Sequence, residues 1–471
     1  MVTLLGVSLT EKKPKFAYLK QVVIGALSGV LVLSLSIVGF GFVGASTTST
    51  TKNSGTTKTD STKTQITNPA TTSGGSCSIA TQTADKRLGT FTGQVIDLNT
   101  GTVLYDNGGS TGSITASTIK YLTAAAAMKA LGSSFKFSTK VVYSPSTPDT
   151  ITLVGGGDPT LNSLASGDSV YKGAAKLSDL AAQVQTWAQA NGVTEVRHLV
   201  LDASLFTGST WETSWPTSER TLGFQPQITA LMVDGDRANP RNAVSARSID
   251  PVGHAGRQFK IALGSLAANA DITNGVARAG ATKIAEVNSA KLSTMIKYMI
   301  SQSDNTLAEM LARQVALAEG LPANFESIQA AYQKALSSMG LNFNAAAIKD
   351  GSGESKNDLI TPALFNDLTA KVLAGTADLR SIVSGFPVAG KSGTLVSRFT
   401  GANAVARGKV YAKTGSIFHA YSLVGYLDAK DGSRLAFAVF ASGPATSVAT
   451  RTAIDTVVTG IYNCGLDLGN N

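Results

Sequence analysis

Residues 117–131 read STIKYLTAAAAMKAL, and this stretch decides the fold. Small polar residues precede an Ala- and Leu-rich run that stops at Gly132, which predicts a helix beginning around residues 115–117. Ser117 and Lys120 are three residues apart, so the helix places both on one face, where the amine can accept the hydroxyl proton as a nucleophile forms. The spacing alone is weak evidence, because three other pairs share it: Ser49/Lys52, Ser133/Lys136 and Ser169/Lys172. Ser117 is favoured because it opens an apolar helix directly after a predicted hairpin at residues 91–105.

A second motif, Ser303-Asp304-Asn305, begins another predicted helix that continues LAEMLARQVAL. A hydroxyl, a carboxylate and an amide at a helix start can take part in chemistry. The same run is also an ordinary helix N-cap, and taken in isolation this alternative is the stronger one.

A third motif, Lys413-Thr414-Gly415, lies at the end of an alternating strand. There the cation and the hydroxyl can bind a substrate carboxylate, while glycine lets a substrate backbone approach. The alternative is a charged strand end before a turn. A similar run at residues 391–393, KSG, has no alternating strand before it and is set aside.

Composition and charge exclude several classes of protein. The chain has 471 residues, 43% hydrophobic and 15% charged, which excludes a wholly disordered protein, a coiled coil and a polytopic membrane protein. Of the net charge of +9, residues 1–45 carry +3 and residues 46–76 carry +2. The rest holds no run of five or six like charges and no basic–aromatic stripe, so we expect no nucleic-acid partner. Three scattered histidines and two cysteines leave little room for a metal site.

The first 76 residues are predicted to direct and tether the chain. Residues 1–21 form a basic cytoplasmic segment, and residues 22–45 contain no charged residue. As a helix, residues 22–45 would span roughly 36 Å, enough to cross a bilayer core. We expect a membrane signal anchor, or a signal peptide cleaved near Ala45, and both place the C-terminal part of the chain on the cell-wall side. Residues 46–76 are rich in Ser, Thr and Gly and predict a disordered tether.

The exported part is predicted to be an α+β domain interrupted by an insert. Runs of β-type residues occur near both ends of it, at residues 91–105 and 408–442, with helical patterns at residues 292–338 and 447–462. Residues 77–140 and 285–471 are predicted to form one domain, an antiparallel sheet flanked by helices, and residues 141–284 a smaller inserted domain. Cys77 and Cys464 are expected to pair in an exported chain and to tie its ends together.

The order SxxK, SDN, KTG is the signature of class A β-lactamases and penicillin-binding proteins. Over residues 80–465 the chain resembles the D-alanyl-D-alanine carboxypeptidase/endopeptidases among the low-molecular-mass (class C) penicillin-binding proteins. Four other stretches carry this resemblance: LVGGGDPTL (153–161), DGSG (350–353), PVAG (387–390) and GTL (393–395). The 186 residues from Ser117 to Ser303 also fit, because the family inserts domain material there.

The chain departs from the family pattern at three places. The stretch after residues 230–234 is shorter, so a small third domain is expected to be reduced or missing. Glu354 and Lys356 stand where an apolar residue and an arginine are usual. Phe418 and His419 follow the third motif where small residues are usual, which would alter the shape of a substrate groove.

The resemblance implies a penicillin-sensitive serine peptidase of the serine β-lactamase/penicillin-binding-protein fold, with peptidoglycan stem peptides and β-lactam antibiotics as partners and no cofactor. Ser117 would be the nucleophile, Lys120 its base, and Ser303 the proton relay to the leaving amine. Asn305, Lys413, Thr414, Gly415 and Ser416 would bind the substrate, with the backbone N–H groups of Ser117 and Ser416 as oxyanion donors. Two alternatives remain: a β-lactamase, for which no ExxLN-like element is found, and a non-catalytic cell-wall-binding protein.

Overall fold

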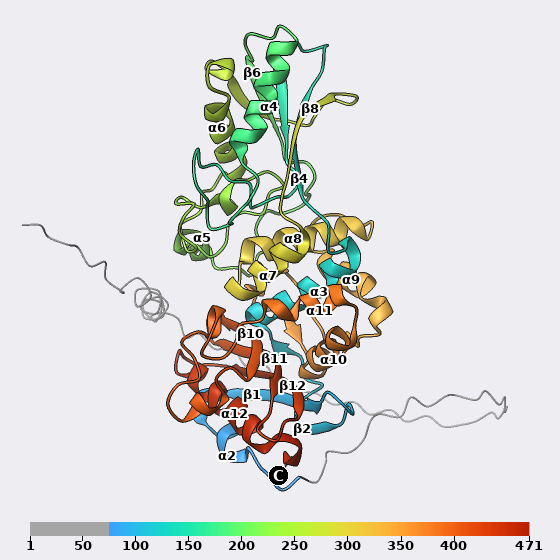
Figure 1. Ribbon diagram of the computed structural model, residues 1–471, viewed down its shortest axis with the longest axis vertical. Helices are drawn as coiled ribbons and strands as arrows, with labels where there is room; N and C mark the ends of the chain where they lie inside the picture. Colours follow the sequence, from blue (N-terminus) through green and yellow to red (C-terminus); the bar gives the residue numbers. More distant parts are fainter. Residues whose placement is uncertain (1–74, 471) are drawn as a thin grey trace, which may run out of the picture. The chain divides into compact units, whose positions relative to one another are not determined.

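The computed structural model describes residues 75–470 (Figure 1). The predicted segments 1–21, 22–45 and nearly all of 46–76 lie outside these residues. Among the residues described, no helix is both long and apolar enough to cross a membrane.

A five-stranded antiparallel sheet forms from both ends of the described chain. The hairpin predicted from residue 91 is present and turns around Gly101, whose φ of +77° suits glycine. The first strand of this hairpin is β1 (Thr90–Asp97), and it pairs with β2 (Val103–Asn107) on one side. On the other side it pairs with β12 (Arg434–Ser442), from the C-terminal end of the chain. In the order β10-β11-β12-β1-β2, the strands are β10 (Val410–Ile417), β11 (Ala420–Asp428), β12 (Arg434–Ser442), β1 (Thr90–Asp97) and β2 (Val103–Asn107).

Alternation along β12 explains why helices cover both faces of this sheet. Phe437 and Val439 point into a core shared with α12 (Thr450–Cys464), and Ala438 and Phe440 point to the other side. There Phe440 stacks on Phe365 of α10 (Pro362–Ala374). The sheet is therefore a middle layer, apolar on both faces.

The helix predicted from residue 117 is α3 (Ile119–Leu131), and a 3₁₀ turn (Ala116–Thr118) precedes it. Every residue from Ile119 to Met128 is buried, because α3 is surrounded by other helices and the sheet. Its neighbours include α7 (Leu292–Gln302), α8 (Asn305–Ala318) and α9 (Ile328–Ala335). The remaining short elements are α2 (Ala80–Thr83), α5 (Ser218–Leu222), α11 (Ala377–Ser381), β3 (Ser113–Ile114) and β9 (Leu359–Ile360).

A second five-stranded sheet forms from the middle of the chain. Its strands are, in the order β7-β6-β5-β4-β8, β7 (Asp271–Asn274), β6 (His198–Asp202), β5 (Thr150–Val154), β4 (Ser138–Tyr143) and β8 (Thr282–Asn288). Its separate core includes residues of α4 (Leu177–Ala190) and α6 (Pro251–Leu263). The β5–β6 and β6–β7 pairs are parallel, a feature that the sequence pattern did not predict. The domain limits of 141 and 284 stay a prediction.

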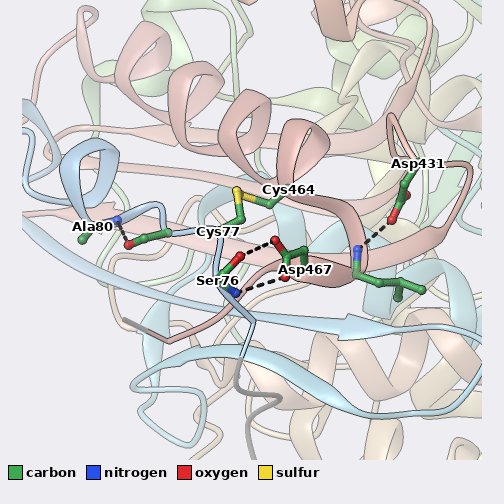
Figure 2. Close-up of a disulfide and its surroundings, with 8 residues drawn as sticks. Ser76, Cys77, Ala80, Asp431, Cys464 and Asp467 are labelled. Atoms are coloured by element: carbon green, nitrogen blue, oxygen red, sulfur yellow. Dashed lines mark hydrogen bonds between the residues drawn. A yellow bond between two sulfur atoms is a disulfide. The ribbon is translucent and has the colours of Figure 1, made fainter.

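The two ends of the described chain are joined covalently. Cys77 and Cys464, at the end of α12, form a disulfide (Figure 2). Beside it the Ser76 hydroxyl donates to the Asp467 carboxylate over 2.7 Å, and the backbone N–H of Cys77 donates to the Asp467 carbonyl over 3.0 Å. The first and last segments therefore hold each other in place at one edge of the fold.

Candidate active site

Ser117 lies on a tight turn that is fixed from two sides. Ala116, just before it, has a φ of +45°, a strained value for a residue with a side chain. The hydroxyl of Ser422, on β11, donates to the Thr115 carbonyl over 2.6 Å and so ties this turn to the sheet. On the other side, Gly353 approaches so closely that a Cβ there would overlap the carbonyl oxygen of Ala116. Ser117 itself stays partly exposed.

Lys120 lies directly under Ser117 and is fully buried. Its Nζ donates to Ser117 Oγ over 2.9 Å, to Asn305 Oδ1 over 2.7 Å and to the carbonyl of Ser352 over 2.5 Å. These three acceptors use all three donor positions of an ammonium group. The first two motifs therefore meet, although Lys120 and Asn305 are 185 residues apart.

The surroundings of Lys120 favour loss of its proton. Burial lowers the pKa of Lys120 to about 8, although the carboxylates of Asp350, Glu354 and Glu309 act in the opposite direction. At pH 7 about one molecule in ten then carries the neutral amine, against a few in ten thousand for an ordinary lysine. A neutral amine in contact with Ser117 Oγ can accept its proton.

The second motif lies between two helices rather than inside one. Ser303 ends α7 with a φ of +60°, and Asp304, not Ser303, is the N-cap of α8. The Asp304 carboxylate accepts from the backbone N–H of Leu307 over 2.8 Å, which satisfies a free donor of the first turn. The cap alternative thus applies to Asp304, and it leaves the side chains of Ser303 and Asn305 partly exposed on either side.

The third motif reaches the same place from β10, an edge strand. Lys413 Nζ donates to Ser303 Oγ over 2.9 Å and to the Thr414 carbonyl over 2.7 Å, and the side chain is fully buried. Burial, together with the positive charge of Lys120, holds the pKa of Lys413 well below its usual range. Lys413 therefore contacts Ser303 and is shielded from solvent, and its contact with a substrate carboxylate stays a prediction.

Thr414 and Ser416 alternate along β10 with the buried residues Lys413 and Gly415. Thr414 is partly exposed and its hydroxyl lies 2.7 Å from that of Thr394, within the GTL stretch. Ser416 is exposed and accepts from Arg451 of α12 over 3.2 Å. Gly415 is buried, and a Cβ there would meet the Thr115 carbonyl and Ser422, so the packing of the strand requires glycine; the approach of a substrate backbone stays a prediction.

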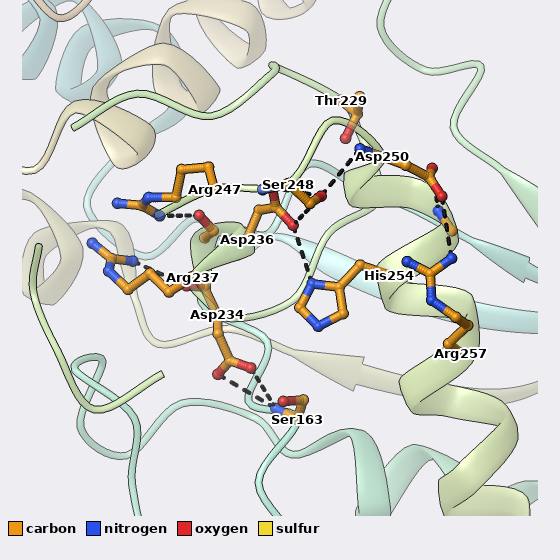
Figure 3. A network of polar contacts seen from close by, with 12 residues as sticks. Ser163, Thr229, Asp234, Asp236, Arg237, Arg247, Ser248, Asp250, His254 and Arg257 are labelled. Atoms are coloured by element: carbon orange, nitrogen blue, oxygen red, sulfur yellow. Dashed lines mark hydrogen bonds and ion pairs between the residues drawn. The ribbon is translucent and has the colours of Figure 1, made fainter. Parts of the chain in front are cut away.

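Sequence reasoning missed the residues that hold the second motif from the insert. Arg237 Nη2 donates to Asp304 over 2.8 Å, and Tyr171 Oη donates to the same oxygen over 3.0 Å. Figure 3 shows the segment that carries Arg237: Asp236 accepts from Ser248, and Asp234 accepts from the backbone of residue 163. Both aspartates adopt positive φ angles, 52° and 59°. No local pattern around Tyr171 or Arg237 signals a partner so far along the chain.

Three elements that are far apart in sequence thus bring two lysine–hydroxyl pairs together, Lys120 with Ser117 and Lys413 with Ser303. A sheet with helices on both faces and this set of side chains at its edge strand define the class of serine β-lactamases and penicillin-binding proteins.

Within that class, the chain belongs to the D-Ala-D-Ala carboxypeptidase 3 (S13) family, whose model matches residues 76–243 and 236–461. It is 36% identical over 400 residues to "Carboxypeptidase DacB" of Mycolicibacterium smegmatis, covering 84% of this chain and 85% of that protein. It is 28% identical to the "D-alanyl-D-alanine carboxypeptidase" of Actinomadura sp., covering 74% and 77%. The crystal structure of penicillin binding protein 4 from Haemophilus influenzae has the same fold, with a TM-score of 0.65 at 22% identity, covering 79% of this chain and 96% of that one. The predicted family and fold class are confirmed.

Proposed function

We propose that this protein is a serine D-Ala-D-Ala carboxypeptidase/endopeptidase that acts on peptidoglycan stem peptides through an acyl-enzyme and is inhibited by β-lactams. Family membership supports the reaction class. The observation that carries the assignment of residues is the bond of Lys120 Nζ to Ser117 Oγ inside a buried, carboxylate-lined site. A binding protein without catalysis would have no use for a buried lysine in contact with a partly exposed serine.

The first half of the reaction forms the acyl-enzyme. The Ser117 hydroxyl gives its proton to neutral Lys120 as Oγ bonds to the carbonyl carbon of a D-Ala-D-Ala bond. The backbone N–H groups of Ser117 and Ser416 receive the developing oxyanion, a contribution of about 3–4 kcal/mol per donor in other acyl-transfer enzymes. The C–N bond then breaks, and the leaving amine takes up the proton that Lys120 received from Ser117, relayed by Ser303, so that Lys120 is neutral again. Water hydrolyses the ester and returns Ser117.

The remaining residues of the trio have supporting roles. Asn305 binds the amide of the acyl chain, and Thr414 binds the terminal carboxylate. We propose that Lys413 acts mainly through Ser303, because its Nζ donates to that hydroxyl and its side chain is fully buried.

This function places the protein on the cell-wall side of the membrane. We propose that residues 22–45 are a signal anchor, with cleavage near Ala45 as the alternative, and that residues 141–284 form an inserted domain between the two halves of the catalytic domain, residues 77–140 and 285–471. Mass spectrometry of the N-terminus from the native membrane distinguishes an anchored chain from a cleaved one.

The test is an intact-mass time course of the full chain with a penicillin, followed by mapping of the adduct. We expect a stable adduct on Ser117 and none in Ser117→Ala. A transient adduct with rapid loss of the drug would point to a β-lactamase. No adduct and no drug loss in folded protein would refute the proposal.

A further inference from the structure

Glu354 lies one residue beyond the turn that receives Lys120. The Asp350 carboxylate holds this turn by accepting from the backbone N–H groups of Ser352, Gly353 and Ser355, over 3.0, 2.5 and 2.7 Å. Because the Ser352 carbonyl in turn accepts from Lys120, the backbone at Glu354 has a fixed position relative to the base.

A single amide connects the side chain of Glu354 to Lys120. Asn305 Oδ1 accepts from Lys120, and Asn305 Nδ2 donates to Glu354 Oε2 over 3.2 Å. An ammonium group can only donate, so the amide oxygen must face Lys120 and its nitrogen must face the carboxyl. Glu354 thus secures the orientation of Asn305 from the side opposite the base.

Charged groups from four parts of the fold surround this chain of contacts. Burial and then the negative charge of Glu219 raise the pKa of Glu354 to about 8, and burial raises the pKa of Glu219 as well. Besides Glu354, three parts of the fold place a charged group near Lys120. They are the turn that contains Asp350, the start of α8 with Asp304 and Glu309, and β10 with Lys413. Glu354 and Glu219 are partly exposed, whereas Asp350, Glu309, Asp304 and Lys413 are buried.

We propose that Glu354 is a positioning residue for acylation: it orients the Asn305 amide toward Lys120, and the fraction of Glu354 that is ionised opposes the loss of a proton from Lys120. This inference rests on the proposed function, because it assumes that Lys120 acts as the base for Ser117.

Two substitutions separate the orienting role from the charge. In Glu354→Gln, the amide oxygen still accepts from Asn305 but the charge is gone. Around pH 8, where Lys120 titrates and part of wild-type Glu354 is ionised, neutral Lys120 should then be more abundant, and the midpoint of the acylation profile should move down by about half a pH unit. In Glu354→Leu both are lost, so the same shift should come with a fall of about tenfold in the plateau rate, because Asn305 is no longer held.

The experiment measures the second-order acylation rate of Ser117 in the full chain by a fluorescent penicillin, across the pH range in which Lys120 titrates. Glu195→Gln is the matched control, since it removes one negative charge in the insert, where Glu195 bonds to Arg197 and Asn269. Its profile should equal that of the wild type. Circular dichroism verifies that each variant is folded.

A shift to lower pH in both Glu354 variants, with the plateau kept only in Glu354→Gln, supports the inference. Profiles that overlay the wild type in both variants, or an equal shift in the control, overturn it and leave the proposed function intact. A wild-type chain that no penicillin acylates overturns the proposed function, and the inference with it.

Discussion

Replacing Arg237 by methionine should destabilise the folded chain by about 3 kcal/mol. Arg237 and Asp304 form an ion pair of 2.8 Å whose side chains are only 3% and 4% exposed. The hydroxyl of Tyr171 completes the group, accepting from Arg237 over 2.9 Å and donating to Asp304. Through this ion pair, Arg237 fixes Asp304, the residue between Ser303 and Asn305.

The magnitude follows from what the methionine would leave behind. Breaking a buried pair by removing one partner costs about 3–5 kcal/mol, because the other charge stays buried without compensation. Asp304 would keep two donors, the Tyr171 hydroxyl and the backbone N–H of Leu307, which argues for the lower end of that range. Acylation should also slow by about tenfold or more, since Ser303 and Asn305 lose a fixed neighbour.

The pH dependence of this loss has a defined sign. Burial would raise the pKa of Asp304, but the charge of Arg237 and the bond from Leu307 hold it below its usual range. A depressed pKa contributes stability that is complete above the unfolded value, about 3.9, and is lost as the pH falls through the folded value. The difference between wild type and Arg237→Met should therefore shrink in acid.

The assay is urea unfolding of the full chain with its disulfide intact, followed by circular dichroism and by penicillin labelling, since two cores need not unfold together. Arg241→Met is the matched control: this exposed arginine of the same segment bonds to the carbonyl of Ser166 and should change stability by less than about 0.5 kcal/mol. Asp304→Asn and the double variant complete a cycle. A loss below about 1 kcal/mol in Arg237→Met, or strict additivity in the cycle, would refute the reasoning.

Three further outcomes are expected. Lys120→Met should lower the acylation rate by at least about a hundredfold at every pH, because no other described group contacts Ser117 Oγ as a base, and normal labelling of this variant would remove Lys120 from the mechanism. Gly353→Ala should abolish penicillin labelling, because the φ of +80° and the overlap of the new Cβ with the Ala116 carbonyl force the loop away from Ser117. Gly432→Ala is the control: this residue also has a positive φ, but the space around it is open, so the variant should label normally. A reductant should lower the free energy of unfolding of the wild type by about 2–5 kcal/mol in urea, but leave that of the Cys77→Ser/Cys464→Ser variant unchanged. Equal responses of the two proteins would show that the disulfide does not form in solution.

Elements whose signals are local could be predicted from the sequence. The helix after Ser117 has its own polar start, apolar run and glycine stop, and β10 to β12 have alternating or apolar runs separated by turns. The three motifs could be found because each sits on such an element and because their order is a known signature. Even so, the sequence indicated a helix N-cap at the second motif without showing which residue forms it. In the structure Asp304 is the N-cap, and the side chains of Ser303 and Asn305 are available for other contacts.

What the sequence could not show depends on contacts between distant residues. The parallel pairs of the second sheet join strands separated by long connections, and period and propensity do not reveal which strands lie side by side. The burial of Lys413 has the same origin, because it results from β10 packing against the turn at Ala116 and against Ser303. A strand-end lysine looks alike in sequence whether it faces solvent or a hydroxyl.

Contacts between distant residues also join the middle of the chain to the second motif. The motifs predict which groups react, but Asp304 is held by Tyr171 and Arg237, which lie 133 and 67 residues before it. A segment placed between the first and second motifs can reach the second without disturbing the sheet that carries the third. Because the pair is buried and charged, its geometry tolerates little adjustment, and a shift of the insert would move Ser303 and Asn305 together. The insert is therefore a part of the active-site framework as well as an addition to it, and the Arg237 cycle measures how large that part is.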